Sequence, residues 1–455
     1  MKTQFHCTKI TTAISLLLTG HLAFADGARF QDFNPLSESA GTTANEAMPI
    51  TLSSPKFKQQ SIADRETQLA DGKPNSGNWD MLTVNETGRQ NERFLFTPFE
   101  TGQGGVQRHN LTTGETDTIW ISPEYGTHIS FDASKWTPWG SYLTAEESWG
   151  NASKFGRLFE LKNPMTATAI SGPLTADSNH GANFVHQNVI PRTSHEGIQF
   201  DKAGNMYFID ELNGGSIYKY TPAASFAHVK AGKADYFAAG TTYVLRVGDG
   251  NAPNATGSYE WVAITDAKGM GLPGAVVITD ANGVTSVDAR ATADVQTFKG
   301  TDYQRPEDLQ IQTVKGREYL YMATTTTHEV YRLDLQNQTL SVFADRNNLD
   351  LATGEPVGSE LTNPDNLAID HDGNIYIVED QPGGVSDDIW FARDLNKDGD
   401  LADEGEGLAR WASNGTLGSE FTGLYFDPQD KRRAWVNIQH PSSGNDRTIE
   451  ITIAK

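Results

Sequence analysis

The sequence has 455 residues, of which 37% are hydrophobic and 21% are charged, so the chain can bury a large core and is not disordered throughout. Its 58 acidic residues outnumber its 36 lysines and arginines, and the net charge of −22 repels phosphate backbones and anionic lipids, which excludes nucleic acid as an expected partner. With 43 glycines, 19 prolines and no long helix-forming tracts, the chain is expected to be mostly β structure.

Residues 1–25 predict a signal for export. An apolar stretch from Ile10 to Leu18 follows basic residues, and the small residues Ala23 and Ala25 form a cleavage site. The stretch is too short to cross a membrane, so we expect no membrane insertion. No twin-arginine pair is present, and we therefore expect a periplasmic or extracellular protein exported unfolded by the general (Sec-type) route. Cleavage would remove Cys7, the single cysteine, and with it every sulfur ligand of the thiol type.

A repeated hairpin organises the rest of the chain. Residues 26–75 have little periodicity and are expected to form an N-terminal arm. After the arm, an apolar strand, a turn of the Asp-x-x-Gly-Asn type and a second apolar strand ending in acids recur, most clearly from His195 to Glu211 and from Pro364 to Asp380. Weaker copies span Trp79–Pro98, His128–Glu147, Pro306–Thr325 and Thr422–Asn437, which makes six in all.

Repeats of three or four strands without a helical period are typical of propeller blades. We therefore predict an all-β fold, a six-bladed β-propeller over residues 76–455. The interval between the third and fourth copies is too long for one blade, and residues from about 221 to 305 are predicted to form an inserted subdomain. A pair of β-sandwiches is the alternative fold.

Acidic side chains recur at two positions of the repeat. In a propeller, the start of the first strand and the end of the second strand share one face. The acids predicted to converge there as metal ligands are Glu146, Glu147, Glu196, Glu211, Glu307 and Glu379, with Asp365 and Asp380 beside them. Like charges gathered in a partly buried mouth need cations, and oxygen-only donors favour several Ca²⁺ ions over Mg²⁺ or Mn²⁺. For any single acid, the alternative is a strand cap or a surface salt bridge.

A second metal signal is local. The segment DLNKDGDLADEGE supplies donors at positions 1, 3, 5 and 7 of an EF-hand-like loop, which are Asp394, Asn396, Asp398 and Asp400. Position 12 is Gly405, so the closing bidentate acid is out of register, and no flanking helices are predicted. We expect a structural calcium site in this loop and not a calcium sensor.

Arg305 is the candidate for binding an anionic substrate. It stands just before Glu307 at the predicted acidic face, where a guanidinium fork can hold a phosphate bidentately beside a metal. A plain salt bridge is the alternative. The sequence has no G-x-S-x-G elbow, no P-loop and no H-E-x-x-H motif, so a serine hydrolase, an NTPase and a zincin are not supported.

Several motifs together resemble those of the PhoX family of secreted alkaline phosphatases. They are TPWGSYLTAEE, HEGIQFDKAGNMYFIDE, RPEDLQ, PDNLAIDHDGN, DLNKDGD and NIQHP, in the family's order from about Asn75 to the C-terminus. The resemblance implies a six-bladed propeller whose central face carries calcium ions and an oxo-bridged iron pair and hydrolyses phosphate monoesters. It also implies that Glu196 and Glu307 are carboxylate metal ligands and that Arg305 binds phosphate, and these three are the predicted catalytic residues.

Two features depart from the family pattern. The family ligates iron with a cysteine in its LTCEE motif, where this sequence has Ala145, and the twin-arginine signal common in the family is missing. Iron is therefore expected from the resemblance alone, and Ala145 argues against it. The first hypothesis is a calcium-dependent, monomeric phosphatase that hydrolyses a small phosphorylated substrate with a metal-bound water.

Two other functions stay open. One is a propeller lactonase or organophosphate esterase with a single calcium held by Glu196, Asn366 and Glu379. The other is a non-catalytic metal-binding propeller protein.

Overall fold

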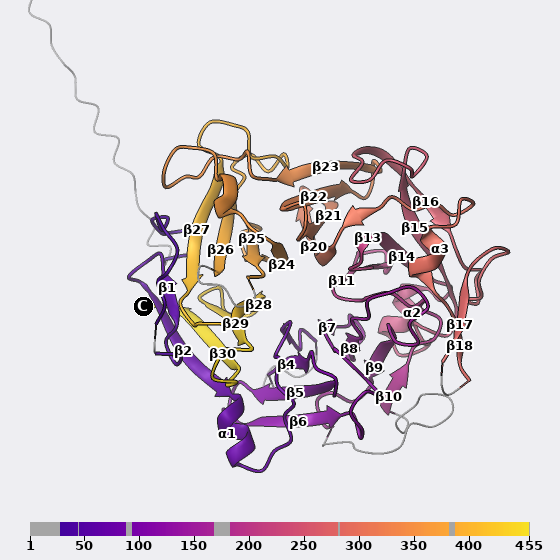
Figure 1. Cartoon of the computed structure of the whole chain (residues 1–455), viewed down its shortest axis with the longest axis horizontal. Helices are drawn as coiled ribbons and strands as arrows, with labels where there is room; N and C mark the ends of the chain where they lie inside the picture. Colours follow the sequence, from indigo (N-terminus) through magenta and orange to yellow (C-terminus); the bar gives the residue numbers. More distant parts are fainter. Residues whose placement is uncertain are drawn as a thin grey trace, which may run out of the picture.

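Hairpins of short antiparallel strands make up most of the chain and are arranged around a central axis (Figure 1). The structure is a computed structural model that describes residues 28–43, 45–87, 93–167, 183–280, 283–381 and 387–454. The predicted export signal in residues 1–25, with Cys7, lies outside the described residues. Among the described residues, no helix is long and apolar enough to cross a membrane.

Six hairpins correspond to the six sequence repeats. They pair β3 (Thr83–Val84) with β4 (Phe94–Phe99), β7 (Lys135–Trp136) with β8 (Tyr142–Ala145), β11 (Ile198–Phe200) with β12 (Met206–Ile209), β20 (Pro306–Val314) with β21 (Arg317–Thr324), β24 (Pro364–Ile369) with β25 (Ile375–Glu379), and β28 (Glu420–Phe426) with β29 (Arg433–Gln439). In each hairpin the first strand lies at the inner edge of its sheet.

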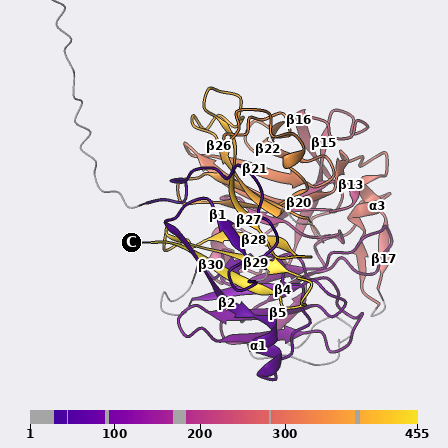
Figure 2. The ribbon, with the colours of Figure 1, turned by 60° about the vertical axis from the view of Figure 1, so that its left-hand side comes forward.

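Outer strands extend four of these hairpins into separate blades. The added strands are β5 (Gly105–Asn110) and β6 (Thr116–Ile121), β9 (Leu158–Leu161) and β10 (Phe184–His186), β26 (Asp387–Arg393) and β27 (Gly407–Asn414), and β30 (Arg447–Ile453). The segment 26–75 closes two blades, because β1 (Ile50–Leu52) pairs with β27 and β2 (Phe57–Asp64) pairs with β30 (Figure 2). Helix α1 (Arg65–Ala70) follows β2, with Asp64 accepting from the Thr67 N–H as its N-cap.

The third and fourth hairpins share one nine-stranded sheet. Its order is β11-β12-β14-β15-β16-β23-β22-β21-β20, and the added strands are β14 (Ile217–Pro222), β15 (Gly240–Val247), β16 (Gly257–Ala263), β22 (Glu329–Asp334) and β23 (Thr339–Ala344). The prediction of six separate blades is therefore corrected. The fold is all-β and propeller-like, with four blades and one sheet that curls back on itself, because β16 reaches the outer edge of the next repeat and pairs with β23.

The two ends of this long sheet meet near the axis. A Cβ atom at Gly197, just before β11, would lie 2.4 Å from the Leu309 nitrogen of β20, so only glycine permits the approach. The sheet is therefore nearly closed. The arrangement is propeller-like and is not the alternative pair of β-sandwiches.

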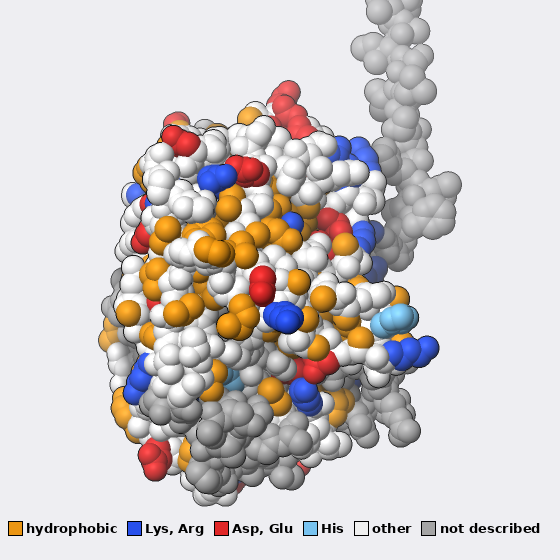
Figure 3. Space-filling model, turned by 90° about the vertical axis from the view of Figure 1, so that its right-hand side faces the viewer, with side chains coloured by type: hydrophobic (Ala, Val, Ile, Leu, Met, Phe, Trp, Pro, Cys, Tyr) orange, Lys and Arg blue, Asp and Glu red, His pale blue; other side chains and the backbone are white. Residues whose placement is uncertain are grey.

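Part of the segment predicted as an insertion, residues 221–305, belongs to the nine-stranded sheet through β15 and β16. The remainder contains α2 (Phe226–Lys230), the hairpin of β17 (Val277–Thr279) and β18 (Thr285–Val287), α3 (Ala289–Ala293) and β19 (Tyr303–Gln304), which pairs with β13 (Asn213–Gly215). On the side of the molecule that this segment forms, hydrophobic side chains gather toward the middle of the face, with a few acidic and basic side chains between them (Figure 3).

Aromatic side chains fill the spaces between neighbouring sheets. Trp120 stacks on Phe184 with ring centroids 4.1 Å apart between the first two blades, and Tyr376 contacts Phe426 with ring centroids 4.7 Å apart between the last two. Such pairs add to the hydrophobic free energy of packing. The packed sheets hold the inner ends of the hairpins in fixed positions around the axis.

Candidate functional site

Two positions of each hairpin face the axis, and one backbone hydrogen bond defines them. In the first hairpin the Glu100 N–H donates to the Asn78 carbonyl (2.9 Å), and the inner residue is Asp80, two places further on. In four other hairpins the residue at the end of the second strand likewise donates its N–H to the carbonyl two places before the inner residue. The inner residue and the donor are Asp132 and Glu147, Glu196 and Glu211, Glu307 and Thr325, and Asp365 and Asp380. In the last hairpin the corresponding residues are Thr422 and Gln439. At these two positions, five of the six hairpins carry at least one carboxylate.

The backbone is unusual just before the inner residue. Asn78, Ser130, Arg305 and Asn363 stand two places before it, and all four have a positive φ, between 41° and 59°. In two of these four hairpins the strand register shifts immediately afterwards, as in the bulge between Pro306 and Leu309, and the last hairpin has a similar shift after Thr422. A bulge turns a side chain away from its regular direction, and left-handed backbone at residues other than glycine is concentrated at functional sites. The repeated distortion directs the inner carboxylates to the axis.

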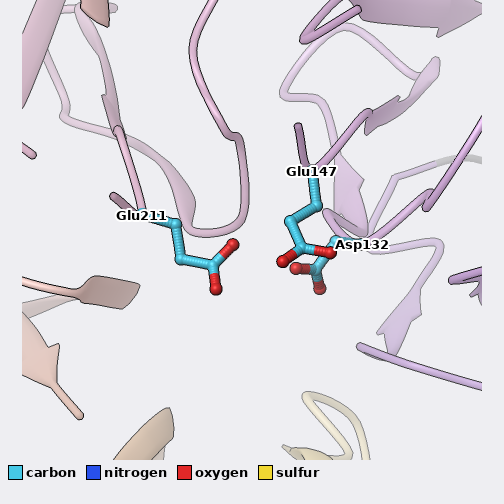
Figure 4. Close-up of side chains that lie close together, drawn as sticks. All are labelled: Asp132, Glu147 and Glu211. Carbon is cyan, nitrogen blue, oxygen red and sulfur yellow. The ribbon is translucent and has the colours of Figure 1, made fainter. Parts of the chain in front are cut away.

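The converging carboxylates line a cavity of about 50 Å³. Its wall consists of Asp80, Glu100, Asp132, Glu147, Glu196, Glu211, Arg305, Glu307, Asp365, Asp380, Glu420 and Thr422. We call this space the acidic cavity. Figure 4 shows Asp132 and Glu147 on one side of it with Glu211 facing them from the other.

Two groups of three carboxylates in this cavity are close enough to share a cation. Within each group one oxygen from every residue lies within 4.8 Å of the others. The first group is Asp132, Glu147 and Glu211, and the second is Glu196, Glu307 and Asp365. Because each group draws on two or three hairpins, a bound ion would connect neighbouring sheets.

Burial and mutual repulsion raise the pKa values of these acids. Burial is the largest cause for Asp80 and for Glu307, and it raises the pKa of each to about 7, although Arg305 opposes the shift of Glu307. Burial, reinforced by neighbouring carboxylates, also holds the pKa well above its usual range for Glu100, Asp132, Glu196, Glu211, Asp365 and Glu420. Near neutral pH the cavity must hold protons or cations.

Several carboxylate oxygens in the cavity have no hydrogen-bond partner among the described residues. Glu196 Oε1 accepts from the Asn366 side chain at 2.8 Å, but its Oε2 accepts no hydrogen bond from the described residues. Asp380 Oδ1 and Glu420 Oε2 are buried and unpartnered in the same way. A buried carboxylate oxygen without a partner is costly, and a cation removes that cost.

The donor set fits calcium and does not fit a thiolate-ligated iron pair. Calcium takes six to eight oxygen ligands in flexible geometry, and the cavity offers only oxygen donors besides the Arg305 guanidinium. No cysteine occurs among the described residues. Ala145, at the position of the family's cysteine, is buried in an apolar cluster with Leu143 and Leu158, and its methyl group offers no ligand.

Arg305 connects the two carboxylate groups. Its Nε lies 2.9 Å from Glu307 Oε1 and 3.1 Å from Glu211 Oε1, and its Nη1 lies 3.3 Å from Asp380 Oδ2. Burial alone would lower the pKa of Arg305, but Glu307, Glu211 and Asp380 outweigh it and raise the pKa. The guanidinium therefore stays charged at the edge of the cavity, where 27% of the side chain is exposed.

Two predicted metal ligands lie outside the acidic cavity. Both oxygens of Glu146 bind Arg157, at 2.8 Å and 2.5 Å, in a fully buried ion pair. Glu379 accepts hydrogen bonds from Trp390 Nε1 (2.9 Å) and from the Thr362 and Asp388 N–H groups. Each precedes an axis-facing residue by one position, and alternation along a strand turns it the other way. The structure therefore does not bring Glu146 and Glu379 together with the other predicted ligands.

The EF-hand-like loop lies apart from the acidic cavity. Its first residue, Asp394, already accepts from the Lys397 N–H (2.6 Å) and the Gly399 N–H (3.1 Å). Asn396 donates to Asp398, which also accepts from the Asp400 N–H at 3.2 Å. The carboxylate groups close enough to share an ion in the described residues do not include this loop. Calcium binding there stays a prediction.

Sequence reasoning missed four of the cavity's acids, which are Asp80, Glu100, Asp132 and Glu420. A signal for them existed, since Asp80 and Asp132 stand at the start of the first strand and Glu100 at the end of the second. The first copy was bounded at Pro98 and the sixth began at Thr422, which left Glu100 and Glu420 just outside. Extending each copy by two residues would have included both.

Comparison with protein families matches residues 73–442 to the family described as alkaline phosphatase PhoX. The chain belongs to the PhoX family. The matched range contains every residue that lines the acidic cavity, from Asp80 to Thr422. No curated protein matches this sequence.

Several solved structures are similar to the chain. Pseudomonas fluorescens PhoX in complex with vanadate, a transition state analogue, aligns with a TM-score of 0.64 at 16% identity, covering 92% of this chain and 98% of that chain. A putative phosphatase from Bacteroides thetaiotaomicron (TM-score 0.41, 12% identity, 84% and 72% covered) and the calcium-binding protein regucalcin from Agrobacterium tumefaciens (TM-score 0.37, 13% identity, 84% and 96% covered) are more distant. The Pseudomonas structure establishes the likeness of fold to PhoX.

Proposed function

We propose that this member of the PhoX family hydrolyses phosphate monoesters at the acidic cavity and depends on several Ca²⁺ ions held there. The observation that carries the proposal is the pair of carboxylate groups joined by Arg305. Membership of an alkaline phosphatase family supports the reaction class, and the Pseudomonas relative holds vanadate, a transition state analogue. The predicted export signal supports a site outside the cytoplasm, where the folded chain would acquire its calcium.

The carboxylates would divide into holders of separate ions. Asp132, Glu147 and Glu211 would hold one cation, and Glu196, Glu307 and Asp365 a second. Bound divalent cations supply positive charge that attracts a phosphate dianion to an otherwise anionic protein, and they activate water for attack on phosphorus. The fixed positions of the hairpins keep the donors preorganised, so little reorganisation is needed when charge develops in the transition state.

Arg305 would hold the phosphate. Its N–H groups now bind Glu211, Glu307 and Asp380, which are also cavity acids. When cations take up those carboxylates, the guanidinium fork can turn its donors to two phosphate oxygens. Its side chain lines the cavity with 27% of its surface exposed, so the fork is accessible to a phosphate from outside. Arg305 would thereby orient the ester and stabilise charge on the transferred group.

The lactonase alternative loses support from the geometry. It relied on Glu196, Asn366 and Glu379 as ligands of one calcium. Glu379 lies outside the cavity, and the Asn366 side chain donates to Glu196 while its oxygen accepts from the Gly423 N–H. Two of the three groups are therefore already engaged in the protein.

Hydrolysis of p-nitrophenyl phosphate at alkaline pH tests the proposal. We expect turnover with calcium, loss of turnover with EDTA and recovery when calcium is restored. Glu307→Gln removes one charge from the second carboxylate group and should lower turnover strongly. Glu404→Gln, a matched change at an exposed residue, should not. Absence of turnover with every metal tried would favour a non-catalytic metal-binding protein.

A further inference from the structure

Trp149 lies at the edge of the acidic cavity with 47% of its surface exposed. Other tryptophans are fully buried in the packing between sheets, namely Trp79, Trp120, Trp390, Trp411 and Trp435. An indole contributes much more free energy when it is buried, and a single exposed apolar residue carries no meaning by itself. The contacts that Trp149 makes with the cavity wall are therefore the observation to consider.

Two groups of the cavity wall touch Trp149. Its indole N–H donates to Glu147 Oε1, a member of the first carboxylate group. The Arg305 guanidinium carbon lies 5.4 Å from the centre of its ring. The backbone on both sides is anchored, because the Ser148 N–H donates to Ser194 Oγ (2.8 Å) and the Ala152 N–H donates to Asp288 Oδ2 (2.8 Å). The indole is therefore held in place beside the proposed phosphate-binding arginine.

The size of the cavity decides where the organic part of a substrate can lie. A volume of about 50 Å³ holds ions and water but not an organic group, and the wall is made of charged residues and Thr422. A phosphate held by Arg305 must leave its ester group outside the cavity. Beside Arg305 at that edge, Trp149 offers an aromatic surface.

We propose that Trp149 determines substrate specificity by stacking on the ring of an aryl phosphate monoester while Arg305 holds the phosphate. The inference rests on the proposed phosphatase function and adds the class of substrate to it. Stacked aromatic rings in an offset or edge-on arrangement stabilise one another beyond simple burial. The site should consequently favour aryl phosphates over small aliphatic phosphates such as glycerol phosphate.

Two variants separate stacking from a structural role of the indole. Trp149→Ala removes the ring and the bond to Glu147, whereas Trp149→Phe keeps a ring and removes only the bond. The readout is the ratio of kcat/KM for p-nitrophenyl phosphate to that for glycerol phosphate, measured on the calcium-loaded protein. We expect the ratio to fall about tenfold in Trp149→Ala and about twofold or less in Trp149→Phe. Met270→Ala, at an exposed residue of the inserted segment, serves as the control.

An unchanged ratio in Trp149→Ala would overturn the inference. Loss of the bond to Glu147 alone would lower kcat/KM for both substrates equally and leave the ratio as it was. Binding of phenylphosphonate and methylphosphonate, measured by calorimetry, provides a readout that needs no turnover. We expect wild type to bind phenylphosphonate about tenfold more tightly, and Trp149→Ala to lose this difference. If no ester is hydrolysed, the proposed function is wrong. If wild type binds the two phosphonates with equal affinity, the role of Trp149 in specificity is wrong, whatever the outcome for hydrolysis.

Discussion

The acidic cavity and the loop from Asp394 to Glu406 are both rich in carboxylates, but the surroundings of their oxygens differ. In the loop, backbone N–H groups supply the partners, as when Lys397 and Gly399 donate to Asp394. In the cavity, Glu196 Oε2 and Asp380 Oδ1 are buried and accept no hydrogen bond from the part of the chain that the structure describes. A carboxylate saturated by N–H donors is already stabilised, whereas an unpartnered buried one needs a proton or a cation.

Two adjacent glutamates at the end of β8 also differ in whether their oxygens have a positively charged partner. Glu146 has an arginine for a partner, while Glu147 has Asp132 beside it and Glu211 opposite it in the cavity. The two glutamates have the same side chain, so the residue type does not show which one faces the metal site. The hydrogen-bond and ion-pair partners of their oxygens do. The density of acids along a sequence is therefore a weaker guide to a cation site than the supply of donors around them.

The largest effect is expected on the stability of the protein, when the buried partner of Arg157 is removed. Glu146→Gln would leave the Arg157 guanidinium buried without its counter-charge and should lower the free energy of unfolding by about 3–5 kcal/mol. Glu260→Gln, which breaks the exposed pair with Arg246, should cost under about 1 kcal/mol. Urea unfolding in calcium measures both. An unchanged stability together with weaker calcium binding would instead make Glu146 a metal ligand.

Arg305→Ala should affect turnover more than stability. Loss of a donor that stabilises transition-state charge lowers kcat by about 10²- to 10³-fold. Arg305→Lys keeps the charge but loses the fork, so we expect an intermediate loss. Arg246→Ala, from a pair on the outer sheet surface, is the matched control. Steady-state hydrolysis of p-nitrophenyl phosphate would refute the role of Arg305 if both Arg305 variants turned over like wild type.

Stability of the metal-free protein should fall as pH rises. Burial raises the pKa of Glu307 from 4.5 to about 7, so between these values the folded chain binds more protons than the unfolded chain. The contribution is fully favourable below about pH 4.5, and by pH 7 its loss costs about 2–3 kcal/mol for this residue. Calcium should remove the dependence, since it replaces the protons.

Urea midpoints from pH 4.5 to pH 8, with EDTA and with calcium, measure this dependence. A metal-free protein that gained stability over the same range would contradict the raised pKa values.

Much of the site could be predicted from the repeat, and its failures have physical causes. The repeat placed Glu147, Glu196, Glu211 and Glu307 at the axis because strand ends share one face. It could not choose between members of the doublets at 146–147 and 379–380, since the choice depends on strand register, which the bulges shift. The pairing of β16 with β23 could not be predicted from the repeat either, because the sequence of a strand does not show which other strand will pair with its free edge.

The smallest expected effect belongs to the loop. If it binds calcium as its spacing predicts, the ion adds about 1 kcal/mol at moderate saturation, because its acids are already satisfied in the absence of metal. Calorimetry with calcium on the double variant Asp394→Ala, Asp398→Ala should show one ion fewer than wild type and a slightly smaller gain in stability. Glu404→Gln, at position 11 of the motif, should bind the full number. Equal stoichiometry in wild type and the double variant would confine calcium to the acidic cavity, because its acids, unlike those of the loop, have unpartnered oxygens.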